Sequence, residues 1–203
     1  MKNGAIMKNL IFGLLAAFIL ITTGTNAQNA TILAIQKKFN NLTDITASYQ
    51  QYTGKTLTAK GTFSYKKADK VRLTFANSLI ISDGKTNWNH DKKQNKVIIT
   101  KSDNKAVSLL SVNRIVNSVP ADCDLSDTGP GKVKMTPKKG KKLGFRSVEI
   151  TKDSQDLIAS IVIEDNSKSI MKVTFSGYSL NRGLADSEFT FKPSGDIKVV
   201  DLR

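Results

Sequence analysis

Residues 47–91 read ASYQQYTGKTLTAKGTFSYKKADKVRLTFANSLIISDGKTNWNHD, and this stretch decides the fold class. Apolar and polar residues alternate along it in short runs, as where Phe63 and Tyr65 flank Ser64. A period of two places alternate side chains on opposite faces of a β-strand. Asp83-Gly84 separates two such runs, and this dipeptide favours the tight turn of a β-hairpin. The stretch therefore predicts consecutive antiparallel strands with one apolar face each.

The alternation continues toward the C-terminus, where Met171, Val173 and Phe175 are separated by polar residues. Glycine and proline interrupt it between residues 128 and 131. This density of short strands is typical of a β-sandwich or a β-barrel. We predict strands at 47–52, 61–67, 71–75, 78–82, 86–91, 96–100, 133–136, 145–151, 157–164, 170–178 and 188–192.

Two segments have helical spacing instead. Apolar residues recur every three or four positions from residue 29 to about residue 42, and again from 105 to 119, where Pro120 ends the pattern. An amphipathic helix must pack its apolar face on another element. We therefore expect both helices to cover an open face or end of the sheet, around an interior that could hold an apolar ligand. Their apolar faces are Ile32, Ile35, Phe39 and Leu42, and Val107, Leu110, Ile115 and Val119.

The first residues predict a secretory signal peptide. Lys2 and Lys8 precede an apolar run at 10–21, and small or polar residues follow as far as Ala27. A run of about a dozen residues is too short for a bilayer, which needs roughly 20, although an uncleaved anchor is the alternative. Cleavage near Ala27 would make residues 1–27 a signal peptide and 28–203 a single soluble domain in the periplasm. No cysteine stands there to carry a lipid anchor.

Composition limits the partners of this domain. Removing 27 of 203 residues leaves 176, enough for one core without disulfides, and Cys123 is the single cysteine. The formal charge falls from +14 to +12 without Lys2 and Lys8. Such charge suits nucleic acid, but export removes that partner. Four lysines surround Gly140, and this cluster is either a solvated loop or a patch for an anionic membrane or an acidic partner. They are Lys138, Lys139, Lys141 and Lys142.

Catalytic motifs are missing from the sequence. It has one histidine, His90, and one cysteine, and no Gly-x-Ser-x-Gly motif. No cysteine and histidine spacing suits zinc, and the glycines at 129–131 lack the lysine of a phosphate-binding loop. We therefore expect no enzyme activity, no metal and no cofactor. The aromatic residues of the strands either pack an ordinary core or line a cavity, and the pattern leaves both open.

Six short motifs follow one another along the chain, and in this order they resemble the periplasmic outer-membrane lipoprotein carrier family (LolA). The resemblance extends over essentially the whole chain after residue 27. The motifs are Ala47-Ser48-Tyr49-Gln50-Gln51, Gly61-Thr62-Phe63, Lys66-Lys67-Ala68, Arg72-Leu73-Thr74-Phe75, the stretch from Ile80 to Asp91 around Ser82-Asp83-Gly84-Lys85 and Trp88, and Phe189-Thr190-Phe191-Lys192-Pro193-Ser194-Gly195.

The resemblance implies an α+β fold that is mainly β, an unclosed, strongly curved antiparallel β-barrel of about ten or eleven strands with amphipathic helices as a lid. It implies a soluble chaperone that binds the acyl chains of lipoproteins, and we expect a monomer. Such a carrier takes its cargo from an inner-membrane exporter to an outer-membrane acceptor. From the basic residues we also expect transient contact with a membrane surface. A carrier or sensor of another lipid or acylated amphiphile on the same fold is the alternative.

The resemblance also implies roles for particular residues. Lys67 and Arg72 match the basic positions of the family, where an arginine before proline holds the lid closed. Here Lys67 and Ala68 replace that pair, and lysine lacks the planar fork of arginine. Leu73 replaces an aromatic residue. The cavity wall would comprise Tyr49, Phe63, Tyr65, Leu73, Phe75, Met171, Val173 and Phe175, and the lid Ile32, Ile35, Phe39, Leu42, Val107, Leu110 and Ile115.

Overall fold

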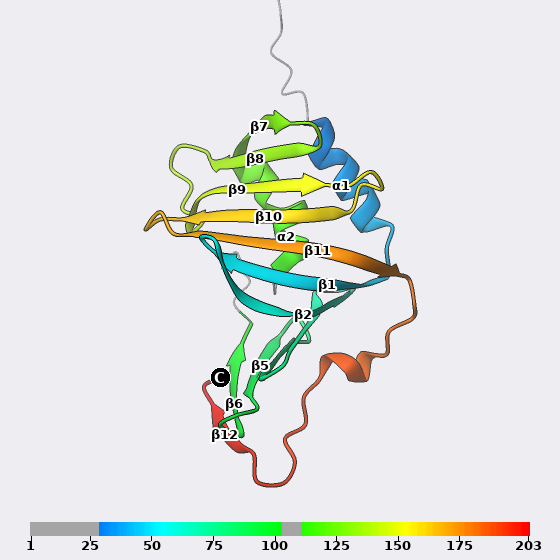
Figure 1. Ribbon diagram of the computed structural model, residues 1–203, viewed down its shortest axis with the longest axis vertical. Helices are drawn as coiled ribbons and strands as arrows, with labels where there is room; N and C mark the ends of the chain where they lie inside the picture. Colours follow the sequence, from blue (N-terminus) through cyan, green and yellow to red (C-terminus); the bar gives the residue numbers. More distant parts are fainter. Residues whose placement is uncertain (1–28, 103–110) are drawn as a thin grey trace, which may run out of the picture.

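The computed structural model describes residues 29–102 and 111–203, and all of its strands belong to one sheet (Figure 1). The strand order is β12-β6-β5-β4-β3-β2-β1-β11-β10-β9-β8-β7. The strands are β1 (Asp44–Thr53), β2 (Thr56–Lys66), β3 (Lys70–Phe75), β4 (Ser78–Ser82), β5 (Thr86–Asp91), β6 (Lys96–Lys101), β7 (Cys123–Gly129), β8 (Lys132–Pro137), β9 (Phe145–Lys152), β10 (Ile158–Asp165), β11 (Ile170–Leu180) and β12 (Lys198–Asp201).

The sheet is strongly curved and open. Strands β7 to β11 form its upper half in Figure 1, β1 and β2 turn the corner, and β3 to β6 with β12 extend below. The edge strands β7 and β12 lie at opposite ends of the strand order and do not pair with each other. The expected unclosed, strongly curved barrel is therefore confirmed, with twelve strands in place of ten or eleven. One pair departs from the antiparallel pattern, because β12 runs parallel to β6.

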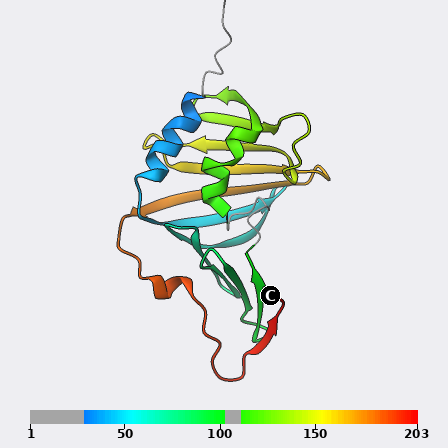
Figure 2. The ribbon, with the colours of Figure 1, turned by 180° about the vertical axis from the view of Figure 1, so that it is seen from behind.

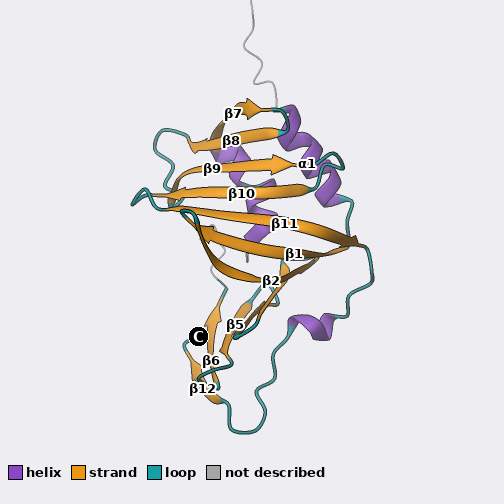
Figure 3. Ribbon diagram, viewed as in Figure 1, coloured by secondary structure: helices purple, strands orange, loops and turns teal. Residues whose placement is uncertain are grey.

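Both predicted helices lie on one face of the upper half of the sheet (Figures 2 and 3). Helix α1 (Ala30–Asn40) begins after Asn29, whose side-chain oxygen accepts a hydrogen bond from the Ile32 N–H. Helix α2 (Val112–Asn117) is shorter than the predicted segment and continues into the 3₁₀ turn η2 (Val119–Asp122). The N-terminal part of that segment, with Val107 and Leu110, and the predicted signal peptide lie outside the described residues.

The strand predicted at 188–192 is wrong. Residues Asp186–Phe189 form the 3₁₀ turn η3, and no regular element follows before β12. The alternation of Phe189 and Phe191 has another cause. Phe189 is fully buried, and the centroids of the Phe191 and His90 rings are 5.0 Å apart. These aromatic residues anchor an irregular segment to the sheet. Pro193 also disfavours a strand there, because it has no N–H to donate to a neighbouring strand.

The apolar residues form two groups. The main core lies between the concave face of the sheet and the two helices. Ile81, Val97 and Ile99 are buried outside that core, on the opposite face of the lower strands. Arg72 lies directly opposite Ile81 and donates to the Glu188 carbonyl, so the C-terminal segment covers this outer face. We call residues 181–197 the C-terminal strap.

Candidate functional site

The predicted wall residues lie on one side of the sheet. Tyr49 pairs directly with Phe175, and Phe63 pairs with Leu73, so each pair shares a face. The rings of Phe63 and Phe175 meet edge to face with centroids 5.2 Å apart, and Tyr49 lies 5.6 Å from Phe75. Six wall residues are buried in the main core, and Phe75 and Met171 are partly buried against it. The buried six are Tyr49, Phe63, Tyr65, Leu73, Val173 and Phe175.

The helices close this interior from the other side. Phe39 of α1 packs on Tyr65 with ring centroids 4.8 Å apart. The five predicted lid residues that fall in the described part of the chain are all buried, and they extend over both helices. They are Ile32, Ile35, Phe39, Leu42 and Ile115.

Polar side chains tie the two helices to each other. The Gln36 Nε2 of α1 donates to the Val116 carbonyl of α2 at 2.9 Å. Asn40 and Asn117 exchange two hydrogen bonds through their side-chain amides, at 3.0 and 2.9 Å. Three hydrogen bonds between the helices favour movement of α1 and α2 as one unit.

The cavity that the described residues enclose beneath the helices is small. A cavity of about 20 Å³ lies among Phe63 and Phe175 of the wall and Phe39 and Leu42 on the helix side. Such a volume has room for about one water molecule. The side chains of the lid therefore occupy the interior themselves, and this conformation is closed. An acyl chain does not fit this cavity unless the helices move away from the sheet.

One polar pair stands in this apolar interior. The Tyr49 hydroxyl donates to the Gln51 Oε1, and burial raises the pKa of Tyr49 to about 12, so the phenol stays neutral. Gln51 lies opposite Val173, which belongs to the main core, and opposite Ala59, which packs against that core. Gln51 is half-buried, and its Nε2 carries two N–H donors that the contact with Tyr49 does not use. The pair can therefore offer N–H donors to whatever enters.

Lys67 lies at the end of the lid. Its Nζ donates to the carbonyl of Asn40, the last residue of α1, and its backbone N–H donates to the Thr43 carbonyl at 3.0 Å. The last carbonyls of a helix lack partners in the helix and carry partial negative charge. An ammonium group stabilises that end. The family resemblance predicts that this position holds the lid closed. In the structure Lys67 contacts the lid helix α1 through one side-chain hydrogen bond.

Arg72 is not brought to the lid. Its Nη1 donates to the Glu188 carbonyl at 3.0 Å and its Nε donates to the Thr74 Oγ1 at 3.3 Å. Both contacts lie on the outer face of the sheet, away from α1. Arg72 therefore fixes the C-terminal strap in this structure.

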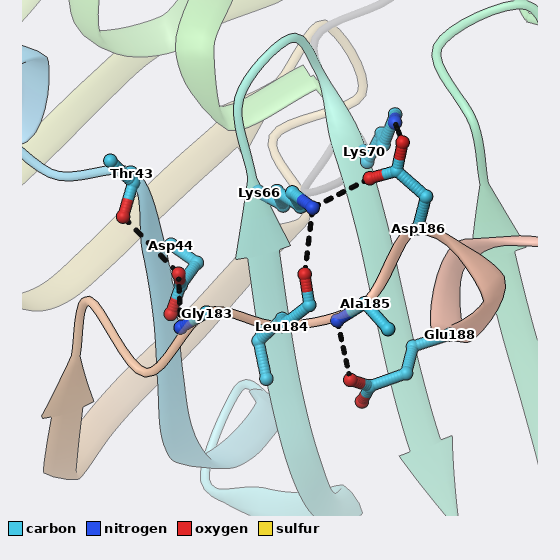
Figure 4. A network of polar contacts seen from close by, with 9 residues as sticks. All are labelled: Thr43, Asp44, Lys66, Lys70, Gly183, Leu184, Ala185, Asp186 and Glu188. Carbon is cyan, nitrogen blue, oxygen red and sulfur yellow. Dashed lines mark hydrogen bonds and ion pairs between the residues drawn. The ribbon is translucent and has the colours of Figure 1, made fainter.

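The turn that carries Lys67 is also held from the outside (Figure 4). Lys66 Nζ lies 2.6 Å from one carboxylate oxygen of Asp186 and 2.7 Å from the Leu184 carbonyl. Lys70 Nζ lies 2.8 Å from the other carboxylate oxygen. Hydrogen bonds from both lysines lower the pKa of Asp186 to about 2. The strap and α1 thus hold the same turn from two sides.

Asp44 anchors the start of the strap, and the sequence gives no signal for this role. Its side chain is 1% exposed. One carboxylate oxygen accepts the Arg182 N–H at 2.7 Å, and the other accepts the Gly183 N–H at 3.0 Å and the Thr43 hydroxyl at 3.2 Å. Burial alone would raise the pKa of Asp44, but these hydrogen bonds favour the carboxylate and the net shift is downward.

The rest of the described chain adds no reactive centre. Cys123 is buried, and burial with the charges of Asp122 and Asp124 raises the pKa of its thiol to about 11. Within residues 29–102 and 111–203, no three His, Cys, Asp or Glu side chains gather as a metal site would require. In the same ranges no helix has the length and hydropathy needed to span a bilayer.

Comparison with known proteins gives a family match over most of the chain. The model of the family described as outer membrane lipoprotein carrier protein LolA matches residues 40–192. A search of curated proteins finds no match.

Solved structures resemble the chain at low sequence identity. An uncharacterised conserved protein from Thermus thermophilus is 15% identical, with a TM-score of 0.55 over 84% of this chain and 96% of that one, and so shares its fold. A putative outer membrane lipoprotein-sorting protein domain from Vibrio parahaemolyticus is 9% identical, with a TM-score of 0.45 over 78% of this chain and 95% of the other. The lipoprotein LppX from Mycobacterium tuberculosis is 12% identical, with a TM-score of 0.42 over 77% and 96%.

Proposed function

Because the chain belongs to the outer membrane lipoprotein carrier protein LolA family, we propose that it shuttles lipoproteins from the inner to the outer membrane with their acyl chains held beneath α1 and α2. The observation that carries the proposal is the apolar interior of an open sheet, closed by two helices that are tied to each other. We further propose that residues 1–27 direct export to the periplasm and that 28–203 act there as one domain.

The energetics of loading support a reversible carrier. Each CH₂ removed from water contributes about 0.8 kcal/mol, so an acyl chain of about 16 carbons gains about 13 kcal/mol. Opening the lid re-exposes apolar side chains, and each one costs about 1.5–3 kcal/mol. The five described lid residues together cost about 8–15 kcal/mol, because α1 and α2 move together. The two terms are of similar size, so cargo replaces the lid in the interior and the lid can later replace the cargo. The five are Ile32, Ile35, Phe39, Leu42 and Ile115.

A carrier of another acylated amphiphile is the second candidate. Two observations favour it. Lys67 holds the helix end by one side-chain hydrogen bond, where a planar arginine could make several. The N–H donors of the Gln51 amide are suited to a carbonyl oxygen, which esters and amides of many lipids share.

Native mass spectrometry of the protein purified from its own periplasm, with extraction of bound lipid, tests the proposal. We expect acylated peptides or intact lipoprotein. Recovery of free glycolipid or another amphiphile would transfer support to the second candidate. An empty protein that also takes up no fluorescent fatty acid would contradict both, because each requires the interior to open.

The lid contact of Lys67 gives a sharper prediction. We expect Lys67→Met to speed the uptake of a fluorescent fatty acid about two- to tenfold, because a net hydrogen bond contributes about 0.5–1.5 kcal/mol to the closed state. Methionine keeps the aliphatic stem and removes the donor. Stopped-flow fluorescence measures the rate.

Lys92→Met is the matched control for this experiment. The Lys92 Nζ also donates to a backbone carbonyl from an exposed position, at 3.0 Å from the Phe75 oxygen, but it contacts neither helix. Its rate should equal that of the unchanged protein. Equal rates of fatty acid uptake in Lys67→Met and the unchanged protein would show that the Lys67 contact does not help to keep the lid closed.

A further inference from the structure

One end of the strands carries exposed apolar side chains beside its turns. Leu57 follows the β1–β2 turn and Ile170 follows the β10–β11 turn, and each is 48% exposed. The two turns are neighbours, because the Gly54 N–H donates to the Ile170 carbonyl at 3.1 Å. Large aliphatic residues at adjacent turns leave apolar surface in water.

These side chains point away from the interior. Leu57 pairs with Tyr52 across β1 and β2, and Tyr52 pairs with Lys172 across β1 and β11. Directly opposed residues share a face of the sheet, and Lys172 alternates with the core residue Val173. Ile170 has the same parity as Lys172. The apolar turns therefore belong to the outer surface and are not a part of the main core.

Lysines flank these turns at the same end of the strands. Lys55 lies in the β1–β2 turn and Lys168 in the β10–β11 turn. The β8–β9 loop, with Lys139 and Lys142, reaches the same end in both views (Figures 1 and 2). Among the described residues, none of these four lysines has an acidic partner.

Most carboxylates at this end are engaged. Asp122 pairs with Lys141 at 2.7 Å, and Glu164 pairs with Arg146 at 3.1 Å. Asp165 accepts backbone N–H groups within its own turn. Asp165 has no ion pair and Asp124 is exposed, so among the described residues two unpaired carboxylates face these four lysines and the net charge of this end is positive.

The interior ends beside this surface. Met171, one residue from Ile170, pairs with Thr53 and packs partly buried against the main core. An apolar chain that leaves the interior along β11 therefore emerges next to Leu57 and Ile170.

We propose that this docking edge, formed by Lys55, Leu57, Lys168, Ile170, Lys139 and Lys142, binds the surface of an anionic phospholipid bilayer. Aliphatic side chains beside turns insert at the level of the headgroups, while the flexible lysines remain at the phosphates. Two aliphatic residues alone make too little apolar area for a stable protein interface, which buries more than about 1,000 Å² in total. A bilayer needs no complementary groove.

Sedimentation with vesicles that contain no cargo tests the docking edge separately from lipid carriage. We expect the purified protein to bind vesicles of phosphatidylglycerol and phosphatidylcholine at low salt, to dissociate as salt rises, and to bind phosphatidylcholine alone at least tenfold more weakly. The pair of substitutions Lys139→Gln and Lys142→Gln should weaken binding about 30-fold, about fivefold for each lysine near the membrane. Leu57→Ser with Ile170→Ser should also weaken it, at unchanged charge.

Lys92→Gln with Lys93→Gln is the control, because it removes the same charge from the exposed β5–β6 turn. It should bind as the unchanged protein does. An equal loss in this control would overturn the proposal, since net charge alone would then explain binding. Equal binding to neutral vesicles, or tighter binding to soluble polyglutamate than to anionic vesicles, would overturn it as well, the latter in favour of an acidic protein.

Discussion

Replacing Gly61 with alanine is expected to destabilise the protein by about 3 kcal/mol or more. A Cβ at this position would lie 1.9 Å from the Thr74 carbonyl oxygen and 2.9 Å from its carbon. Both are backbone atoms of β3, so no side chain can rotate to make room. Gly61 pairs with Tyr49 on one side and Phe75 on the other, and the clash would separate β2 from β3 beside the proposed cavity.

Urea unfolding measures this effect. Gly140→Ala is the control, because nothing lies within 4 Å of a Cβ there, although its φ of +84° is unfavourable for alanine. We expect a cost of about 1 kcal/mol in the control. Similar midpoints for the two variants would show that β3 adjusts freely, and the close approach of the strands would then have no energetic consequence.

Replacing Asp44 with alanine is expected to cost about 3 kcal/mol and to release the C-terminal strap. The backbone N–H groups of Arg182 and Gly183 would lose their acceptor, and each buried unsatisfied donor costs about 1–3 kcal/mol. Limited proteolysis should then cleave within 181–197 well before the unchanged protein is cut. Asp124→Ala, at an exposed carboxylate of β7, should change neither stability nor cleavage. An intact strap in the Asp44 variant would contradict this anchoring role.

Asp44 also predicts a direction for the pH dependence. Its pKa in the folded protein lies below the ordinary value of 3.8, so the unfolded chain takes up this proton first as the pH falls. The stabilisation is complete above that ordinary pKa and is lost as the pH falls through the lower, folded pKa. Acid titration of the unfolding free energy should therefore show a smaller loss in Asp44→Asn than in the unchanged protein. Equal losses would mean that Asp44 adds nothing to the acid sensitivity.

The sequence predicts those parts of the fold in which one face of an element is buried. Met171, Val173 and Phe175 alternate because β11 lies against the main core, and Ile32 and Ile35 recur because α1 covers that core. Strand β7 was missed because it is an edge strand whose alternation is weak, as in its exposed Asp124. β12 was missed because its residues are mostly exposed and it is defined by its pairing with β6.

The candidate site is less accessible to sequence reasoning. The contact of Lys67 with α1 followed from a family resemblance, because a lone lysine before a turn carries no such information. The partners of Asp44 lie 138 and 139 positions away in the sequence, and no local sequence pattern can predict a contact over such a separation. The closed state depends on how completely the lid side chains fill the interior, and this packing is a property of the assembled core.

The pairing of β1 with β11 also determines how early in synthesis the sheet can form. Thr53 pairs with Met171 and Ile45 with Leu180. The first strand of the chain therefore cannot pair with β11 until more than a hundred further residues have been synthesised. Joining such distant partners is entropically costly and slow. During synthesis, β1 lacks one of its two neighbours until about residue 180 has left the ribosome. The twelve-stranded sheet is therefore joined into one piece only late in translation, and its two halves stay separate until then.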